Sequence, residues 1–171
     1  MAAGSTYTPI ATQTLSSTAS SVTFSSIPQG YTDLIIVGNL GISNTGTTLS
    51  LRFNGDTGTN YSETTLSGNG STASSSRASN INNAYLNDTT AFNSSLEGNI
   101  IFNVMNYSNS TTYKTVLGRV NRASSGSYPG SAAWVNLWRS TSAITSIVLF
   151  PTDNSNIISG STFSLYGILA A

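Results

Sequence analysis

The chain of 171 residues carries six basic and six acidic residues, no cysteine and no histidine. Charged residues make up only 7% of it, far below the roughly 25% of an average soluble domain. This composition excludes disulfides, thiolate zinc sites and histidine-dependent catalysis, and the absence of a basic excess argues against nucleic-acid binding. We therefore expect no cofactor and no nucleic-acid partner.

The length suits one domain that buries a real core. The first fifteen residues lack the basic start and apolar run of a signal peptide, and no apolar stretch approaches the roughly 18 residues of a membrane span. We expect a soluble protein that is made in a cytoplasm and has no membrane partner.

The N-terminal residues show no strand periodicity. We expect an extended arm over 1–11, in which Tyr7, Pro9 and Ile10 are the only bulky side chains, and a globular domain over 12–171. Residues 13–16 and 22–27 are the first strand candidates, and Pro28 to Gly30 end the second.

The clearest strand signals follow in 34–37 and 49–53. The first is apolar on both faces, as in a central strand buried on two sides, and the second alternates apolar and polar residues, as in a strand with one face in the core. Asn54 and Gly55 tolerate positive φ and predict a tight turn after it.

The segment 66–80 is low in complexity and has almost nothing to bury, which predicts a long exposed loop or a surface ordered by a partner. Strand character returns in 84–86, 95–107 and 113–121. A Ser/Gly loop over 122–130 precedes the last strands, over 132–139, 144–150 and 162–168.

These elements predict an all-β fold, a single-domain antiparallel β-sandwich of nine or ten short strands without a helix. A jelly-roll-like version is favoured, because strands apolar on both faces recur and several connections are long enough to cross between sheets. A lectin-like or immunoglobulin-like topology would produce much the same pattern.

The segment 132–139 places two tryptophans, Trp134 and Trp138, on one strand face and Ala133, Val135 and Leu137 on the other. One face belongs to the core and the other needs a partner. The tryptophans are covered by a second sheet or a long loop in one interpretation. They form a subunit interface or a sugar-stacking platform in the other.

The acidic residues offer little chemistry. The run 54–63 spaces oxygens as a calcium loop does, but only Asp56 and Glu63 bring charge, and hairpin turn chemistry explains the same residues. Hydrolysis of a glycan needs two paired carboxylates. Asp33 and Asp153 fit surface or capping positions, so we expect no metal site and no enzyme.

Four arginines stand at potential contact positions. Arg119 and Arg122 are expected to flank one turn, while Arg52 and Arg139 are expected on polar strand faces. Scarce charges in a neutral chain suit interfaces, where arginine forms bidentate pairs, but a solvated arginine explains the same pattern.

Five segments together, YTDLIIVGNL, LRFNGDTGTNYS, GNGSTASSS, TSAITSIVLFP and STFSLYGILAA, resemble the small β-sandwich virion proteins of tailed bacteriophages. The resemblance spans about residues 12–171. It implies a structural protein on the capsid surface of the virion: a decoration or cement protein that binds over joints between major capsid protein subunits, usually as a homotrimer.

The nearest rival is a tail-fibre or receptor-binding module that recognises a glycan of the host surface, and a carbohydrate-cleaving spike comes third. In the leading interpretation the arm is ordered on assembly. The residues expected to contact the capsid or sister subunits are Tyr7, Pro9, Ile10, Arg119, Arg122, Trp134 and Trp138.

Overall fold

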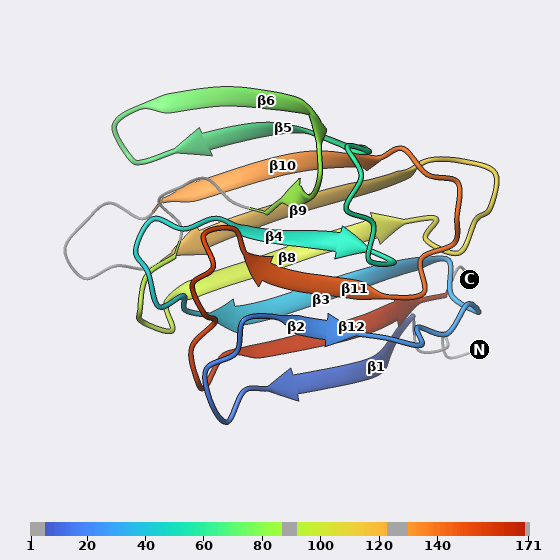
Figure 1. Ribbon diagram of the computed structural model, residues 1–171, viewed down its shortest axis with the longest axis horizontal. Coiled ribbons are helices and arrows are strands. Elements are labelled where there is room, and N and C mark those ends of the chain that lie inside the picture. The colour runs from blue at the N-terminus through green and yellow to red at the C-terminus, as the bar shows by residue number, and fades with distance from the viewer. Residues whose placement is uncertain (1–5, 87–91, 123–129, 170–171) are drawn as a thin grey trace.

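The computed structural model describes residues 6–86, 92–122 and 130–169, and in these ranges the chain forms two antiparallel sheets and no helix (Figure 1). The predicted all-β sandwich is confirmed. The strands are β1 (Tyr7–Thr14), β2 (Val22–Phe24), β3 (Asp33–Leu40), β4 (Leu49–Phe53), β5 (Tyr61–Gly68), β6 (Ala73–Ile81), β7 (Ala84–Tyr85), β8 (Gly98–Met105), β9 (Lys114–Arg122), β10 (Ser131–Trp138), β11 (Ile147–Pro151) and β12 (Thr162–Ile168).

The two sheets differ in width. The large sheet has the order β1-β12-β3-β8-β9-β10-β5-β6, and the small sheet has the order β2-β11-β4-β7. The chain passes repeatedly between them, which is one of the two features on which the jelly-roll expectation depended. The hairpin β5–β6 and the meander β8–β9–β10 instead stay within the large sheet. Figure 1 shows the small sheet in front of the middle of the large one.

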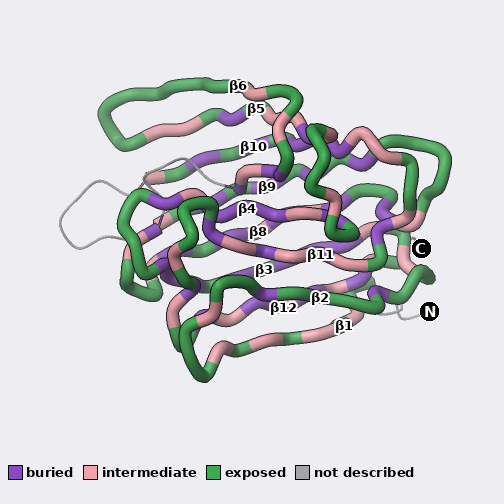
Figure 2. Tube along the Cα trace, in the orientation of Figure 1, coloured by how far each residue is buried: buried purple, intermediate pink, exposed green. Residues whose placement is uncertain are grey.

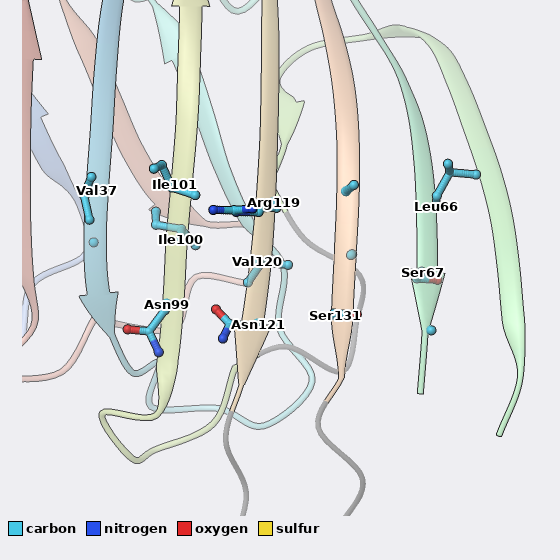
Figure 3. A pocket seen from close by; sticks show the side chains of 14 residues that line it. Val37, Leu66, Ser67, Asn99, Ile100, Ile101, Arg119, Val120, Asn121 and Ser131 are labelled. Atoms are coloured by element: carbon cyan, nitrogen blue, oxygen red, sulfur yellow. The ribbon is translucent and has the colours of Figure 1, made fainter. Parts of the chain in front are cut away.

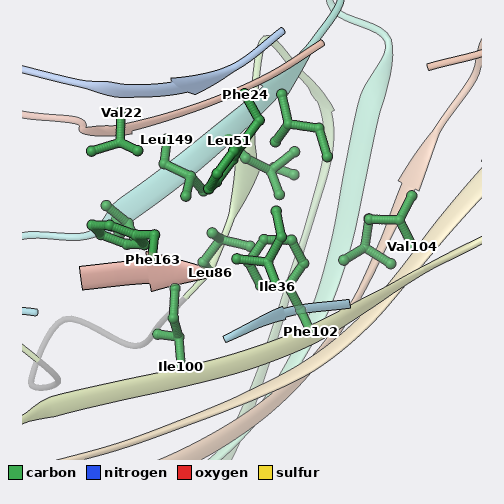
Figure 4. Close-up of a cluster of buried hydrophobic side chains, with 14 of the residues drawn as sticks. Val22, Phe24, Ile36, Leu51, Leu86, Ile100, Phe102, Val104, Leu149 and Phe163 are labelled. Carbon is green, nitrogen blue, oxygen red and sulfur yellow. The ribbon is translucent and has the colours of Figure 1, made fainter. Parts of the chain in front are cut away.

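The core fills the space between the sheets, where inward-facing residues of both layers meet. Figure 2 shows that buried positions occur along strands of both sheets. Leu51 and Leu149 point inward from the small sheet, and Ile36, Phe102 and Phe163 point inward from the large sheet (Figure 4). All five are at most 1% exposed. Full burial of each such side chain contributes about 1.5–3 kcal/mol, so this layer holds the sandwich together.

Strand β3 shows how burial differs between the inner and outer faces of the large sheet. Its inward residues Leu34 and Ile36 are fully buried, as the sequence predicts for a central strand. On the other side Ile35 is covered by its neighbours, but Val37 remains 42% exposed. The expectation of burial on two sides therefore holds fully for one side only, because none of the described residues forms a layer over the second.

Strands form in both the described part of the expected N-terminal arm and the expected long loop; residues 1–5 of the arm lie outside the described residues. Residues 7–11 belong to β1, which pairs with β12, so the sheet begins five residues before the predicted domain boundary. The segment 66–80 forms most of the hairpin β5–β6. The hairpin is exposed as predicted, with β6 almost entirely in solvent. The two strands are held together by backbone hydrogen bonds, which do not require apolar and polar side chains to alternate along the sequence.

Two turn features are confirmed. Asn54 and Gly55 both have positive φ, at 52° and 69°. The Asn54 side chain also fixes the approach to β11: its amide donates to the carbonyl oxygen of Ala143 at 2.8 Å and accepts from the backbone of Thr145 at 2.8 Å.

Gly118, in β9, is a point of very close packing within the large sheet. A Cβ atom there would lie 2.5 Å from Cζ2 of Trp134 and 2.7 Å from Cβ of Phe102, both shorter than real contacts. The indole of Trp134 therefore lies on the bare backbone of the neighbouring strand, and only glycine leaves room for it.

We predict that Gly118→Ala lowers the free energy of unfolding by about 1–3 kcal/mol, because the added methyl group overpacks the core. Gly30→Ala is the matched control, since a Cβ at Gly30 meets no atom within 4 Å. Urea unfolding of both variants measures the difference. Equal midpoints would contradict the packing described for Trp134.

Candidate binding surface on the outer face of the large sheet

The outer face, defined as the side of the large sheet turned away from the small sheet, carries unusually many exposed apolar side chains. Val37 and Met105 are 42% exposed, Val135 48%, Leu117 53% and Leu66 60%. A single exposed apolar residue is ordinary, but a contiguous apolar patch marks an interaction surface.

The strand register makes this patch contiguous. One row across the sheet runs Val37, Ile101, Arg119, Ala133 and Leu66, each directly opposite the next on the neighbouring strand. Side chains that are directly opposite have Cβ atoms about 4.5–5.5 Å apart, so the row forms one surface.

The next row runs Ile35, Asn103, Leu117, Val135 and Thr64. The side-chain oxygen of Asn103, in the middle of this row, is buried without a hydrogen-bond partner. An acceptor left without a partner costs free energy, so this position gains from a donor on whatever covers the face.

The face is hollowed along these rows. A hollow of about 750 Å³, open to solvent, lies over Val37, Ile101, Ala133 and Leu66, and a smaller adjoining one of about 380 Å³ shares Ile101 and Ala133 with it. Arg119 lines both hollows, and Figure 3 shows its side chain reaching from β9 toward Ile101 of β8.

The two tryptophans predicted as contact residues lie in the core. Trp134 is 1% and Trp138 3% exposed, so the interpretation that a second sheet or a long loop covers them is confirmed and both are removed from the candidate surface. Trp138 stacks on Tyr61 at 6.3 Å between ring centroids, and its Nε1 donates to Oδ2 of Asp56 at 2.7 Å. The exposed side of β10 is instead the aliphatic one, with Ala133 and Val135.

Asp56 closes the turn after β4 and is not placed as a metal ligand. Its carboxylate accepts hydrogen bonds from the Gly58 backbone, from Asn60 and from Trp138. Desolvation alone would raise the pKa of Asp56, but these three bonds outweigh it and lower the pKa. Within the described ranges, no group of three acidic side chains gathers where it could hold a metal ion.

The residues expected to anchor an arm lie on the edge strand β1. Tyr7 pairs with Ile168 and Pro9 with Tyr166 of β12, and both stay exposed, with Tyr7 at 57%. Ile10 sits at the bulge between Pro9 and Ala11 and packs against the core. Tyr7 and Pro9 thus remain at the surface, at the far edge from the hollow, while Ile10 is partly buried.

The two arginines expected to flank one turn both lie within β9. Arg119 is exposed on the outer face, whereas Arg122 is partly buried at the end of the strand, opposite Gly98. The strand is longer than its apolar residues suggest, because its last residues are polar on both sides. Of the predicted residues, Arg119 alone lies within the hollow.

A half-buried carboxyl group lies on the inner side of the same sheet. Glu63 of β5 is paired with Asn136 of β10, and both side chains reach β7: the Tyr85 backbone hydrogen-bonds the Glu63 carboxyl, and Asn136 Nδ2 donates to the Tyr85 carbonyl oxygen at 2.8 Å. Glu63 Oε2 and Asn136 Oδ1 have no donor. Burial raises the pKa of Glu63 to about 7.

We predict that stability falls as the pH rises from about 4.5 to about 7, because the folded chain holds a proton on Glu63 that the unfolded chain releases near its ordinary pKa of 4.5. Glu63→Gln should flatten this slope and gain about 1–2 kcal/mol over the parent at pH 8, a figure reduced for the carboxyl's partial exposure.

Urea unfolding at pH 4.5, 6 and 8 measures the effect. Glu97→Gln, which also removes one carboxyl but from the loop before β8, serves as the control and should keep the parent's slope. An unchanged slope in Glu63→Gln would show that another group titrates.

Comparison with known proteins assigns this chain to no family. No family model and no curated protein matches the chain. A protein of unknown function from Shewanella oneidensis MR-1 is 10% identical over 100% of this chain and 82% of that chain, with a TM-score of 0.17. A putative pore-forming toxin from Bacteroides vulgatus is 8% identical over 80% and 54%, with a TM-score of 0.11. At these scores neither likeness supports an argument. None of the described residues belongs to a helix that could cross a membrane.

Proposed function

We propose that this chain is a structural subunit of a bacteriophage virion, a decoration or cement protein that binds the capsid surface over joints between major capsid protein subunits, as a homotrimer and without turnover. One observation carries the proposal: the contiguous apolar outer face of the large sheet, with Leu117 and Val135 about half exposed at its centre. The resemblance to phage virion proteins names the kind of partner.

The outer face suits a role that depends on buried surface. The core between the two sheets is complete without it, so this face is free to cover a partner. A stable protein interface buries about 1,600 Å² in total, and repetition over many capsid sites adds strength even where each contact is weak. The low charge of the chain favours close packing in such an array.

A receptor-binding module of a tail or fibre is the second candidate, since the hollow of about 750 Å³ falls within the size range of ligand sites. The lining of that hollow is less favourable for a glycan. No aromatic ring is among its residues in the described ranges, and Trp134 and Trp138, the platform considered from the sequence, are buried.

We predict that Leu117→Glu reduces attachment to capsids at least tenfold, because it places a charge in the middle of an apolar contact. Co-sedimentation with capsids that lack the protein measures attachment. Thr23→Glu, an exposed strand position on the small sheet, is the matched control and should bind as the parent does. Equal binding of both variants would remove the outer face from the interface.

Copy number separates the two candidates. Quantitative mass spectrometry of purified particles should count hundreds of copies for a shell protein, whereas a few dozen or fewer would favour the tail. A chain that is absent from particles altogether would overturn both.

A further inference from the structure

Some charged side chains of this neutral chain are hydrogen-bonded within the fold, and others are not. Three of its six basic side chains donate hydrogen bonds to backbone carbonyl oxygens. Arg52 donates to the carbonyl oxygen of Asn82 at 3.0 Å, Arg139 to that of Thr59 at 2.6 Å, and Lys114 to that of Thr112 at 2.7 Å. These three groups therefore have partners within the fold.

The carboxyl groups of the described residues likewise accept hydrogen bonds, and their donors are uncharged. Asp33 accepts from the Asn106 backbone, Asp56 from Trp138, Asp153 from Thr47 and Glu97 from Asn93. Glu63 turns inward to β7. The fold thus satisfies these acids with hydrogen bonds from uncharged groups, and Arg52 acts on Asp56 only through its nearby charge.

Two arginines remain on the outer face. Arg119 of β9 and Arg77 of β6 are exposed, and neither makes a hydrogen bond or ion pair within the described ranges. Arg77 is opposite Thr64, an outward position, and it lines a third hollow, of about 520 Å³, together with Val135 and Leu137.

On the half of the outer face that holds Arg119 and Arg77, no acidic side chain of the described residues balances their positive charge. From β8 to β6, the outward positions that the structure describes hold no acidic residue. Glu63 adjoins the third hollow, but its carboxyl group is bonded to Tyr85 on the inner side. Asp33, on β3, lies beyond β8 and accepts from Asn106. A chain of zero net charge thus presents a locally cationic, apolar surface.

The spacing of the two arginines sets the geometry of a partner. Three strand intervals and one step of two residues separate them, about 16 Å at roughly 4.8 Å per interval and 3.4 Å per residue. Leu66 and Ala133 lie between them. In an extended segment, residues four apart face the same way and span about 13 Å, and the long arginine side chains cover the difference.

We propose that the outer face binds an extended, acidic segment of a partner protein, with two carboxylates four residues apart on Arg119 and Arg77 and an apolar residue between them on Leu66. Desolvated arginine–carboxylate pairs are strong and bidentate, and the apolar floor of the hollow excludes water around them. This inference deepens the proposed function, on which it rests, by stating the chemistry of the capsid surface that is bound.

The test uses the full chain and a labelled probe peptide, acetyl-TVTETVTETV-amide, which places two Glu and the intervening Val on one side of a strand. Fluorescence anisotropy should show saturable binding that weakens as salt is added. Two control peptides should bind at least about tenfold more weakly: TVTQTVTQTV, which lacks the charge, and TVTETETVTV, which has the acids two residues apart.

Variants of the protein locate the site. Arg119→Gln and Arg77→Gln should each weaken binding of the probe about tenfold or more, and Arg119→Lys should recover part of the loss. Arg122→Gln removes the same charge away from the outer face and should bind within twofold of the parent. Cooperative urea unfolding confirms that each variant is folded.

Failure to bind the probe, equal binding of the uncharged peptide, or full binding by the Arg119→Gln, Arg77→Gln double variant would each overturn the inference. These outcomes are independent of the copy number in particles. A chain present in hundreds of copies that ignores the acidic peptide would leave the decoration role standing and remove only the acidic partner.

Discussion

The structure depends on the burial of one face of an eight-stranded sheet beneath a narrower four-stranded sheet. Ile36, Phe102 and Phe163 meet Leu51 and Leu149 in this layer, and the strand alternation then forces every second residue to the opposite side. No third layer follows in the described chain. Apolar residues at the outward positions are therefore left exposed by the same geometry that builds the core, and the candidate surface is a direct consequence of the architecture.

Scarcity of charge shapes the rest of the molecule. With 12 charged residues in 171, most polar contacts join hydroxyls, amides and backbone. Thr12 contacts Ser164 at 2.9 Å and Thr14 contacts Thr162 at 3.0 Å across β1 and β12. Carboxylates such as Asp153 are held by neutral donors. Because the described carboxylates are hydrogen-bonded by uncharged groups, Arg119 and Arg77 are left available on the outer face, where two charges dominate a neutral surface.

Sequence patterns located the strands whose apolar residues alternate or run continuously, and they missed strands such as β5 and β6 that lack either pattern. The strands β3, β4, β8 and β12 were predictable, because alternation or continuous apolar runs report contact with the core. Before Ile81 the only apolar side chain at an inward position of β6 is the small Ala78, opposite Glu63, and the strand resembles a loop in every property except backbone pairing. Pairing depends on where the neighbouring strand lies, and that information is not local.

The sequence by itself determined an all-β sandwich, its turn at Asn54–Gly55 and the division of 132–138 into an aromatic and an aliphatic face. Only the tertiary structure decided which of these two faces meets the second sheet. Both faces are apolar enough to be buried, and the choice depends on Gly118 making room for Trp134 and on Asp56 accepting from Trp138, contacts between strands that are distant along the chain. Once the tryptophans turn inward, Val135 must turn outward, beside Arg119 and Leu117 on the neighbouring strand.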